Sequence, residues 1–408
     1  FSRIVTHLGE GEDYSEESFL HSRASWDYIA ESYREFSRDP SFVDYFWTIR
    51  IMHSPIWVLN DIADNLLPAK MYHTISTGYA GFLGAMLKRR TGKPLLLSEH
   101  GIYTKERKID LFQSEWISDN RGLVEKNNAE MAYFREKWVN FFTELGRECC
   151  QASDRIVALY ERNRERQMED GAPQERTLNI PNGIDLPRMQ KVRAARGDNI
   201  PPVACLIGRV VPIKDVKTFL RAMRTLVNVL PDAEGWIAGP EDEDKEYAKE
   251  CHGLVTSLGL EKNVKFLGFQ KIDELLPKVG VIVLSSISEA LPLVLLEGFA
   301  AGVPAVSTDV GSCRQLIEGL GEADRAYGKA GEVVGIADPE ALGNAVAALL
   351  KDKDAWHQAQ QAGIRRVENL YTQEMMFGAY RDLYQSLVED TDAASPQESN
   401  NRRREGRH

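Results

Sequence analysis

Hydrophobic residues in this chain follow two alternating patterns, short apolar runs and longer amphipathic stretches. The run 280–285 is short, apolar and rich in β-branched residues, and serine, glutamate and proline follow it, so it predicts a buried strand. Residues 216–230 repeat apolar side chains at helical spacing and predict an amphipathic helix. The same alternation predicts further strands at 71–75, 94–98, 155–160, 177–180, 203–207, 235–238, 264–267 and 304–308. Strands that alternate with helices are typical of parallel, helix-covered sheets, so we expect an α/β fold.

The alternating pattern occurs in two blocks, and the chain is long enough for more than one domain. Its 408 residues exceed one ordinary core, so two or three domains are expected. Residues 188–202 are polar and basic and form the best candidate linker. We therefore predict two Rossmann-like domains, at 1–187 and 203–371, and a polar, disordered tail at 391–408.

The N-terminal block contains helical patterns rich in aromatic residues. Residues 15–37 predict one helix, residues 42–67 predict two helices near Pro55 and Pro68, and residues 121–150 predict a long helix. The first of these patterns carries a stripe that we expect in the core, made of Phe19, Trp26, Ile29, Tyr33 and Phe36.

Composition and charge narrow the classes of function. The net charge of −11 and the pI near 5.4 argue against a nucleic-acid-binding surface, which would be basic. Five cysteines without CxxC spacing indicate neither a disulfide framework nor a zinc ribbon, and a reducing cytoplasm is the simplest location. We see no transmembrane run and no signal peptide. We therefore expect a cytoplasmic protein, recruited to a membrane only through a partner.

The segment from Ser285 to Gly311 is the strongest candidate for a ligand site. Glu289 and Glu297 are separated by seven residues, and Pro292 between them suits the first turn of a helix. Ala290 and Leu291 stand where a capping side chain would, and both are apolar. We therefore expect the backbone amides of Leu291, Leu293 and Val294 to be free for a ligand. Such amides and two glutamates suit a phosphorylated, polyhydroxylated ligand. The simpler alternative is an ordinary crossover with a surface glutamate at each end of its loop.

Cations and a histidine occur at the ends of other predicted strands. Arg209 and Lys214 lie in one loop after the strand 203–207, where they could stabilise the charge of a departing diphosphate. Two solvated loop cations are the alternative. His100 follows the strand 94–98, and ligands in open α/β sheets bind beyond the carboxyl ends of strands, although a lone histidine is more often structural.

Taken together and in order, these motifs resemble glycosyltransferase family 4. The pattern consists of Gly208-Arg209 with Lys214, then Glu289 with Glu297, then Thr308-Asp-Val-Gly311. Within that family the sequence is most similar to the Pel exopolysaccharide glycosyltransferases, at 98–107, 180–185, 239–244 and 266–269. The resemblance implies a GT-B fold, with two Rossmann-like domains facing across a cleft. It also implies retaining, metal-independent transfer of glucose from UDP-glucose to a growing polysaccharide.

The resemblance further implies roles for individual residues. Arg209 and Lys214 would hold the diphosphate, and Glu297 would bind the ribose hydroxyls. Glu289 would contact the hydroxyls of the donor sugar, with help from the backbone of Ala290, Leu291 and Leu293.

The resemblance also implies roles for residues of the N-terminal domain. His100 would approach the sugar from that domain, and Asn182 would lie in the cleft between the two. The last helix, at about 372–389, would cross back onto the first domain. The chain begins at Phe1, and residues 1–14 hold no strand with a glycine-rich turn, so we expect a fragment without its true N-terminus.

Some features favour other hypotheses. Gln315 stands where the family often has a glutamate, so we assign it no catalytic role. Asp242 and Asp244 match the Asp-x-Asp metal site of another glycosyltransferase class, but the two loop cations already supply positive charge, so we expect neither a metal nor another cofactor. The alternatives are a family-4 enzyme with another nucleotide sugar or a small acceptor, and a non-catalytic nucleotide-sugar-binding subunit of an inner-membrane polysaccharide export complex.

Overall fold

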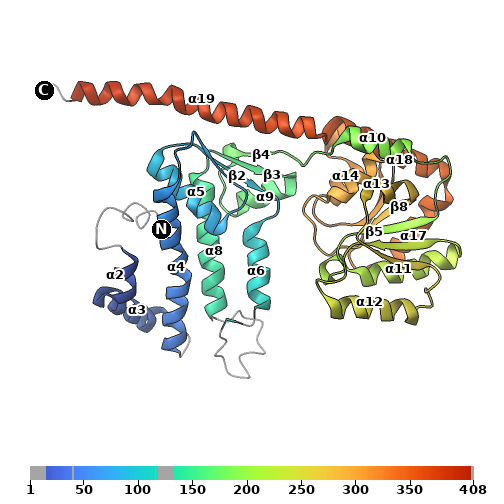
Figure 1. The fold of residues 1–408 in the computed structure, drawn as a ribbon, viewed down its shortest axis with the longest axis horizontal. Helices are drawn as coiled ribbons and strands as arrows, with labels where there is room; N and C mark the ends of the chain where they lie inside the picture. The colour runs from blue at the N-terminus through green and yellow to red at the C-terminus, as the bar shows by residue number, and fades with distance from the viewer. Residues whose placement is uncertain (1–14, 39–40, 115, 118–132, 406–408) are drawn as a thin grey trace. The chain divides into compact units, whose positions relative to one another are not determined.

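The computed structural model describes residues 15–38, 41–114, 116–117 and 133–405, the last fifteen of them by their backbone alone. Two compact units can be distinguished (Figure 1). The N-terminal unit comprises Phe1–Ile180 with Arg381–His408, and the C-terminal unit comprises Pro181–Tyr380.

The N-terminal unit is built on a four-stranded parallel sheet in the order β1-β2-β3-β4. The strands are β1 (Tyr72–Thr74), β2 (Leu95–Glu99), β3 (Arg155–Ala158) and β4 (Thr177–Asn179). The described helices before β4 are α2 (Glu16–His21), α3 (Arg23–Phe36), α4 (Phe42–Asn65), α5 (Gly78–Thr91), α6 (Tyr103–Gln113), α8 (Tyr133–Ala152) and α9 (Glu161–Glu169). All four strands agree with the predicted positions to within about two residues, because each is a short apolar run between polar turns.

The helical part of this unit differs from the sequence prediction in three ways. Residues 15–37 form two helices rather than one, because Ser22 is extended and caps α3 by accepting from the amide of Ser25. Residues 42–67 form one helix rather than two, since Pro55 lies inside α4. Proline leaves the carbonyl four residues earlier without its helical donor. That carbonyl belongs to Ile51, which is 54% exposed. A water molecule can therefore donate the hydrogen bond that Pro55 cannot. The predicted core stripe is only partly buried, because Trp26 and Phe36 are 48% and 60% exposed.

The predicted long helix at 121–150 is described only in part. It appears as α8, from Tyr133 to Ala152, and residues 121–132 lie outside the described residues. Its buried face carries Phe134, Trp138, Phe141 and Phe142, which pack with α4 and α5 in the core of the unit. The predicted absence of a glycine-rich turn at 1–14 also falls outside the described residues.

The C-terminal unit contains a six-stranded parallel sheet in the order β10-β9-β8-β5-β6-β7. Its strands are β5 (Val203–Ile207), β6 (Glu234–Ala238), β7 (Val264–Gly268), β8 (Val281–Leu284), β9 (Ala305–Thr308) and β10 (Gly331–Val334). Its helices include α11 (Val216–Val229), α12 (Lys245–Ser257), α13 (Ile272–Leu275), α14 (Leu293–Ala300), α15 (Cys313–Glu318), α16 (Gly321–Arg325), α17 (Pro339–Lys351) and α18 (Lys353–Leu370). Helix α11 packs beside α17 on one face of the sheet, and α14 packs beside α18 on the other (Figure 1).

The structure differs from the predicted linker at 188–202. This segment belongs to the C-terminal unit, and residues Leu186–Ala194 form helix α10. Asp185 caps this helix by accepting a hydrogen bond from the amide of Arg188 at 3.0 Å. The prediction was wrong here because a short surface helix has mostly polar residues and resembles a linker in composition.

Helix α19 (Gln373–Glu405) is longer than the predicted crossing helix at 372–389. Its backbone continues through residues for which a disordered tail is predicted. The composition of that stretch does not account for the helix, because Pro396 and several serine, asparagine and aspartate residues within it disfavour helix. No helix in the described part of the chain is both long enough and apolar enough to cross a membrane.

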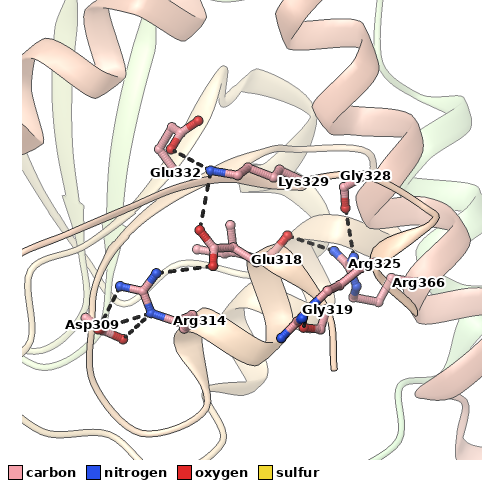
Figure 2. Close-up of polar contacts among 10 residues, drawn as sticks. Asp309, Arg314, Glu318, Gly319, Arg325, Gly328, Lys329, Glu332 and Arg366 are labelled. Carbon is pink, nitrogen blue, oxygen red and sulfur yellow. Dashed lines mark hydrogen bonds and ion pairs between the residues drawn. The ribbon is translucent and has the colours of Figure 1, made fainter. Parts of the chain in front are cut away.

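A buried arginine fixes the segment that follows β9. Arg366 of α18 is fully buried, and its Nε donates to Asp324 Oδ1 at 2.6 Å. Its other nitrogens donate to backbone carbonyls, including those of Ile317 and Gly328 at 2.8 Å (Figure 2). A buried charge of this kind is tolerated because every side of the guanidinium has a partner. Arg366 therefore holds together α15, α16 and the loop at Gly328, which have no sheet hydrogen bonds of their own.

Candidate functional site

The candidate site residues of the C-terminal unit follow two strands that are neighbours in the sheet. Arg209 and Lys214 lie in the loop after β5, and Glu289 lies in the loop after β8. Strands β5 and β8 pair in parallel, so both loops leave the same edge of the sheet. That edge is where ligands bind in open α/β sheets.

Lys214 and Glu289 are in direct contact. The Lys214 Nζ donates to Glu289 Oε1 at 2.5 Å, and the two side chains are 24% and 12% exposed. The same carboxylate oxygen accepts a hydrogen bond from Ser286 Oγ at 2.7 Å. A lysine and a glutamate that are 75 positions apart in sequence therefore form one polar centre.

Further hydrogen bonds join the two loops. Ser285 Oγ donates to the carbonyl of Lys214, and the amide of Ile287 donates to the carbonyl of Ile213, both at 2.9 Å. Asp215 ends the first loop in a left-handed conformation and caps α11 by accepting from the amide of Thr218. The position of Lys214 relative to the second loop is thus fixed by backbone contacts as well as by its ion pair.

The start of α14 matches the sequence prediction of an uncapped helix. Pro292 is the N-cap residue, and no described side chain caps the helix there. The first amides of an α-helix have no acceptor within the helix. Those of Leu293 and Val294 can therefore bind an anion or a hydroxyl oxygen. Behind this turn, the amide of Ser312 donates to the carbonyl of Ala290 at 2.9 Å and holds the loop in place.

Arg209 has a different partner from Lys214. Its guanidinium donates to both oxygens of Glu243 at 2.6 and 2.7 Å, and both side chains are about half exposed. It also lines a cavity of about 640 Å³ at the carboxyl ends of β5, β6 and β7. The other lining residues include Gly208, Gly239, Pro240, Phe269, Gln270 and Lys271.

Glu297 has Arg188 and Asp273 as charged neighbours. Burial raises the pKa of its carboxyl group, and the nearby Arg188 opposes that shift. Arg188 forms a bidentate pair with Asp273, at 2.6 and 3.0 Å, and both of these residues line the cavity. Sequence reasoning missed Arg188, Asp273 and Ser286. Arg188 was missed because it lies in the predicted linker. Asp273 and Ser286 could have been found from their positions after the strands β7 and β8.

The remaining predicted residues are placed as follows. His100 is exposed immediately after β2 in the N-terminal unit, near His73. Asn182 is half-buried at the start of the C-terminal unit. Their predicted roles towards the sugar and in an interdomain cleft stay predictions. Gln315 donates to the hydroxyl of Tyr371 at 3.2 Å, a contact that explains it without any catalytic role.

The Asp-x-Asp sequence has a structural explanation. Asp244 caps α12 by accepting from the amide of Tyr247 at 3.0 Å, and Glu243 pairs with Arg209. Among the described residues, no group of three or more histidine, cysteine, aspartate or glutamate side chains could hold a metal ion. All five cysteines are buried and free.

Comparison with known proteins adds the family of each part. Residues 190–366 match the family described as Glycosyl transferases group 1, and residues 1–175 match a domain of unknown function, DUF3492. The D-inositol 3-phosphate glycosyltransferase 2 of Catenulispora acidiphila is 28% identical to this chain over 337 residues, which cover 78% of this chain and 72% of that protein.

Solved structures share the fold. Anabaena HepE in complex with UDP has a TM-score of 0.60 and 18% identity, covering 81% of each chain. Sucrose-phosphate synthase from Thermosynechococcus elongatus has a TM-score of 0.61 and 19% identity, covering 84% of this chain and 80% of that one. These likenesses show an α/β fold with two parallel sheets, as in GT-B glycosyltransferases. The chain carries a glycosyl transferases group 1 domain at residues 190–366 and is a glycosyltransferase.

Proposed function

We propose that this protein is a retaining, metal-independent glycosyltransferase that moves glucose from UDP-glucose to a growing exopolysaccharide. The observation that carries the proposal is the contact between Lys214 and Glu289 beside the uncapped start of α14. It places a cation, a hydroxyl acceptor and free amides at one edge of the sheet. A phosphorylated sugar needs all three.

The cations would stabilise the leaving group. Breaking the bond between sugar and diphosphate builds negative charge on the distal phosphate, and fixed positive charge at that point lowers the barrier. Lys214 has three N–H donors, so it can bind phosphate while it keeps its bond to Glu289. Arg209 can exchange its exposed partner Glu243 for phosphate oxygens, which it can bind in bidentate fashion. Two such cations would make a metal ion unnecessary.

The glutamates would bind hydroxyl groups. We propose that Glu289 accepts from the donor sugar and that Glu297 accepts from the ribose, with the amides of Leu293 and neighbouring residues at the phosphate. We propose that the leaving phosphate itself takes the proton of the acceptor on the same face, so that no covalent glycosyl intermediate forms. Glu289 then positions the sugar. Trapping a covalent glycosyl adduct on Glu289 would contradict this mechanism.

The identity of donor and acceptor rests on similarity. Anabaena HepE has been solved with UDP and with UDP-glucose, which supports a uridine nucleotide here. The cavity beside Arg209 has room for part of such a ligand. The sequence resemblance to the Pel enzymes supports a polysaccharide acceptor. It also supports recruitment to inner-membrane export proteins as the proposed route to a membrane.

Calorimetric titration with UDP, GDP and ADP in the presence of EDTA tests the proposal. We expect selective binding of UDP, lost or weakened at least tenfold in the Arg209→Ala/Lys214→Ala variant. The matched control is Lys217→Ala/Lys265→Ala, which removes two cations that are paired with Glu250 and Glu234 outside the site. The control should bind UDP like the wild type.

The outcomes separate the hypotheses. Binding that requires a divalent ion, or no nucleotide binding by the wild type, would contradict the proposed site. Selective UDP binding without sugar release or transfer would favour a non-catalytic nucleotide-sugar-binding subunit. Turnover with another nucleotide sugar would retain the enzyme and replace the donor.

A further inference from the structure

The carboxylate of Glu289 is held from one side. Its Oε1 accepts two hydrogen bonds, from Lys214 Nζ at 2.5 Å and from Ser286 Oγ at 2.7 Å. Within the described residues, no hydrogen bond reaches its Oε2. One oxygen is therefore fixed by the protein, and the other is the one left to accept a hydrogen bond from a ligand.

Ser286 is itself firmly placed. It is 1% exposed, and its carbonyl accepts a hydrogen bond from Thr308 Oγ1 at 2.7 Å. That bond ties the end of β8 to the end of β9, so the serine cannot follow the glutamate if the loop moves. A buried hydroxyl that donates to a carboxylate makes a charge-assisted bond, which is stronger and more directional than a neutral one.

We infer that Ser286 is a positioning residue, which orients the Glu289 carboxylate so that Oε2 faces a hydroxyl group of the donor sugar. The inference rests on the proposed function and deepens it, because it concerns sugar recognition within the same site. Lys214 alone is a poor orienting group, since its ammonium is to be shared with the diphosphate once the donor binds. Ser286 has no such second task, so it fixes the orientation of the carboxylate while the lysine also binds phosphate.

The test separates sugar recognition from nucleotide binding. We expect Ser286→Ala to bind UDP within about twofold of the wild type, because the nucleotide contacts remain. The additional affinity of UDP-glucose over UDP, and kcat for transfer, should fall about 10- to 100-fold, as expected for a misplaced reacting group. Ser286→Thr keeps a hydroxyl and should restore much of both.

A matched control and a second variant address folding. Ser307→Ala removes an equally buried hydroxyl that donates to the backbone carbonyl of Thr308 and does not contact Glu289, so it should behave like the wild type. Ser286→Cys has nearly the size of serine but a weak donor, and it should show the loss even if the alanine variant folds poorly.

A double-mutant cycle identifies the path of the effect. If Ser286 acts through Glu289, adding Ser286→Ala to Glu289→Gln should cost little further activity. An unchanged preference for UDP-glucose in Ser286→Ala, an equal loss of UDP affinity, or a full loss on top of Glu289→Gln would overturn the inference.

Wild-type titrations with UDP keep the two proposals distinguishable. If the wild type binds UDP and transfers sugar while Ser286→Ala is unaffected, only the role of Ser286 fails. If the wild type binds no nucleotide, the proposed function fails and the role of Ser286 with it.

Discussion

The glutamate loop depends on one glycine that lies behind it. Gly311 has a φ of +54°, a backbone conformation that side chains other than glycine's disfavour. A Cβ at this position would lie 2.3 Å from the carbonyl oxygen of Glu289 and 2.5 Å from that of Ala290. The backbone of Glu289 can therefore occupy its place only because residue 311 has no side chain.

Substitution of this glycine should therefore damage activity as well as stability. We expect Gly311→Ala to lower the free energy of unfolding by about 1–2 kcal/mol from backbone strain alone. It should also displace Glu289 and reduce sugar transfer at least tenfold. Gly259→Ala is the matched control, since Gly259 has a φ of +63° and nothing within 4 Å of its added Cβ. Urea unfolding and transfer assays on both variants test this, and equal losses of activity would contradict it.

Single residues were also where sequence reasoning reached its limit. The placement of Arg209, Lys214 and Glu289 at one sheet edge could be predicted, because each follows a recognisable strand. Their roles towards a ligand stay predictions. The contacts of Arg188 with Asp273 could not be predicted, because they join positions 85 residues apart on two surface segments. The hydroxyl of Ser286 could not be assigned either, since a serine after a strand is usually only a turn residue.

At the scale of elements, charges that look alike in sequence differ widely in burial. Arg366 is fully buried against Asp324 and several carbonyls, whereas Arg314 is 51% exposed. Figure 2 shows the pairs of Arg314 with Asp309 and Glu318. Helical periodicity predicts α18 as an element but gives no reason to place an arginine at its centre. Five of the six strands of the C-terminal unit were predicted, whereas β10 and the buried contacts of Arg366 were not.

Removal of the two arginines should have very different effects on stability. Arg366→Met leaves Asp324 buried without its cation, and we expect a loss of about 3–5 kcal/mol in the free energy of unfolding. Arg314→Ala removes two solvent-screened ion pairs and should cost less than about 1 kcal/mol. Urea denaturation of the full chain, followed by circular dichroism, compares them. Similar losses in both variants would show that the buried network has no special part in holding α15 and α16.

At the scale of the whole molecule, each unit has its own sheet and its own core, so each carries its own sources of pH dependence. The N-terminal unit contains a buried acid, Glu99, at the carboxyl end of β2. Burial raises the pKa of this group to about 7, although Gln167 and Thr77 donate hydrogen bonds to it and partly offset the shift. An acid with a raised pKa in the folded state keeps its proton when the unfolded chain has lost it.

The stability of the N-terminal unit should therefore fall as pH rises. Below about pH 4.5 Glu99 is protonated in both states and has no effect on unfolding. Between that pH and about 7 only the unfolded chain releases the proton, so stability falls with rising pH and levels off above 7. The full effect is at most about 3 kcal/mol.

Glu99→Gln cannot ionise and should remove that slope between pH 5 and pH 8. Because the Lys214 and Glu289 centre lies in the other unit, the variant should bind UDP like the wild type at both pH values. Urea unfolding at the two pH values measures the slope, and titration with UDP measures the independence of the site. An identical pH slope in the variant would show that Glu99 is not the group responsible. A loss of UDP binding would show that the C-terminal unit depends on the fold of its neighbour.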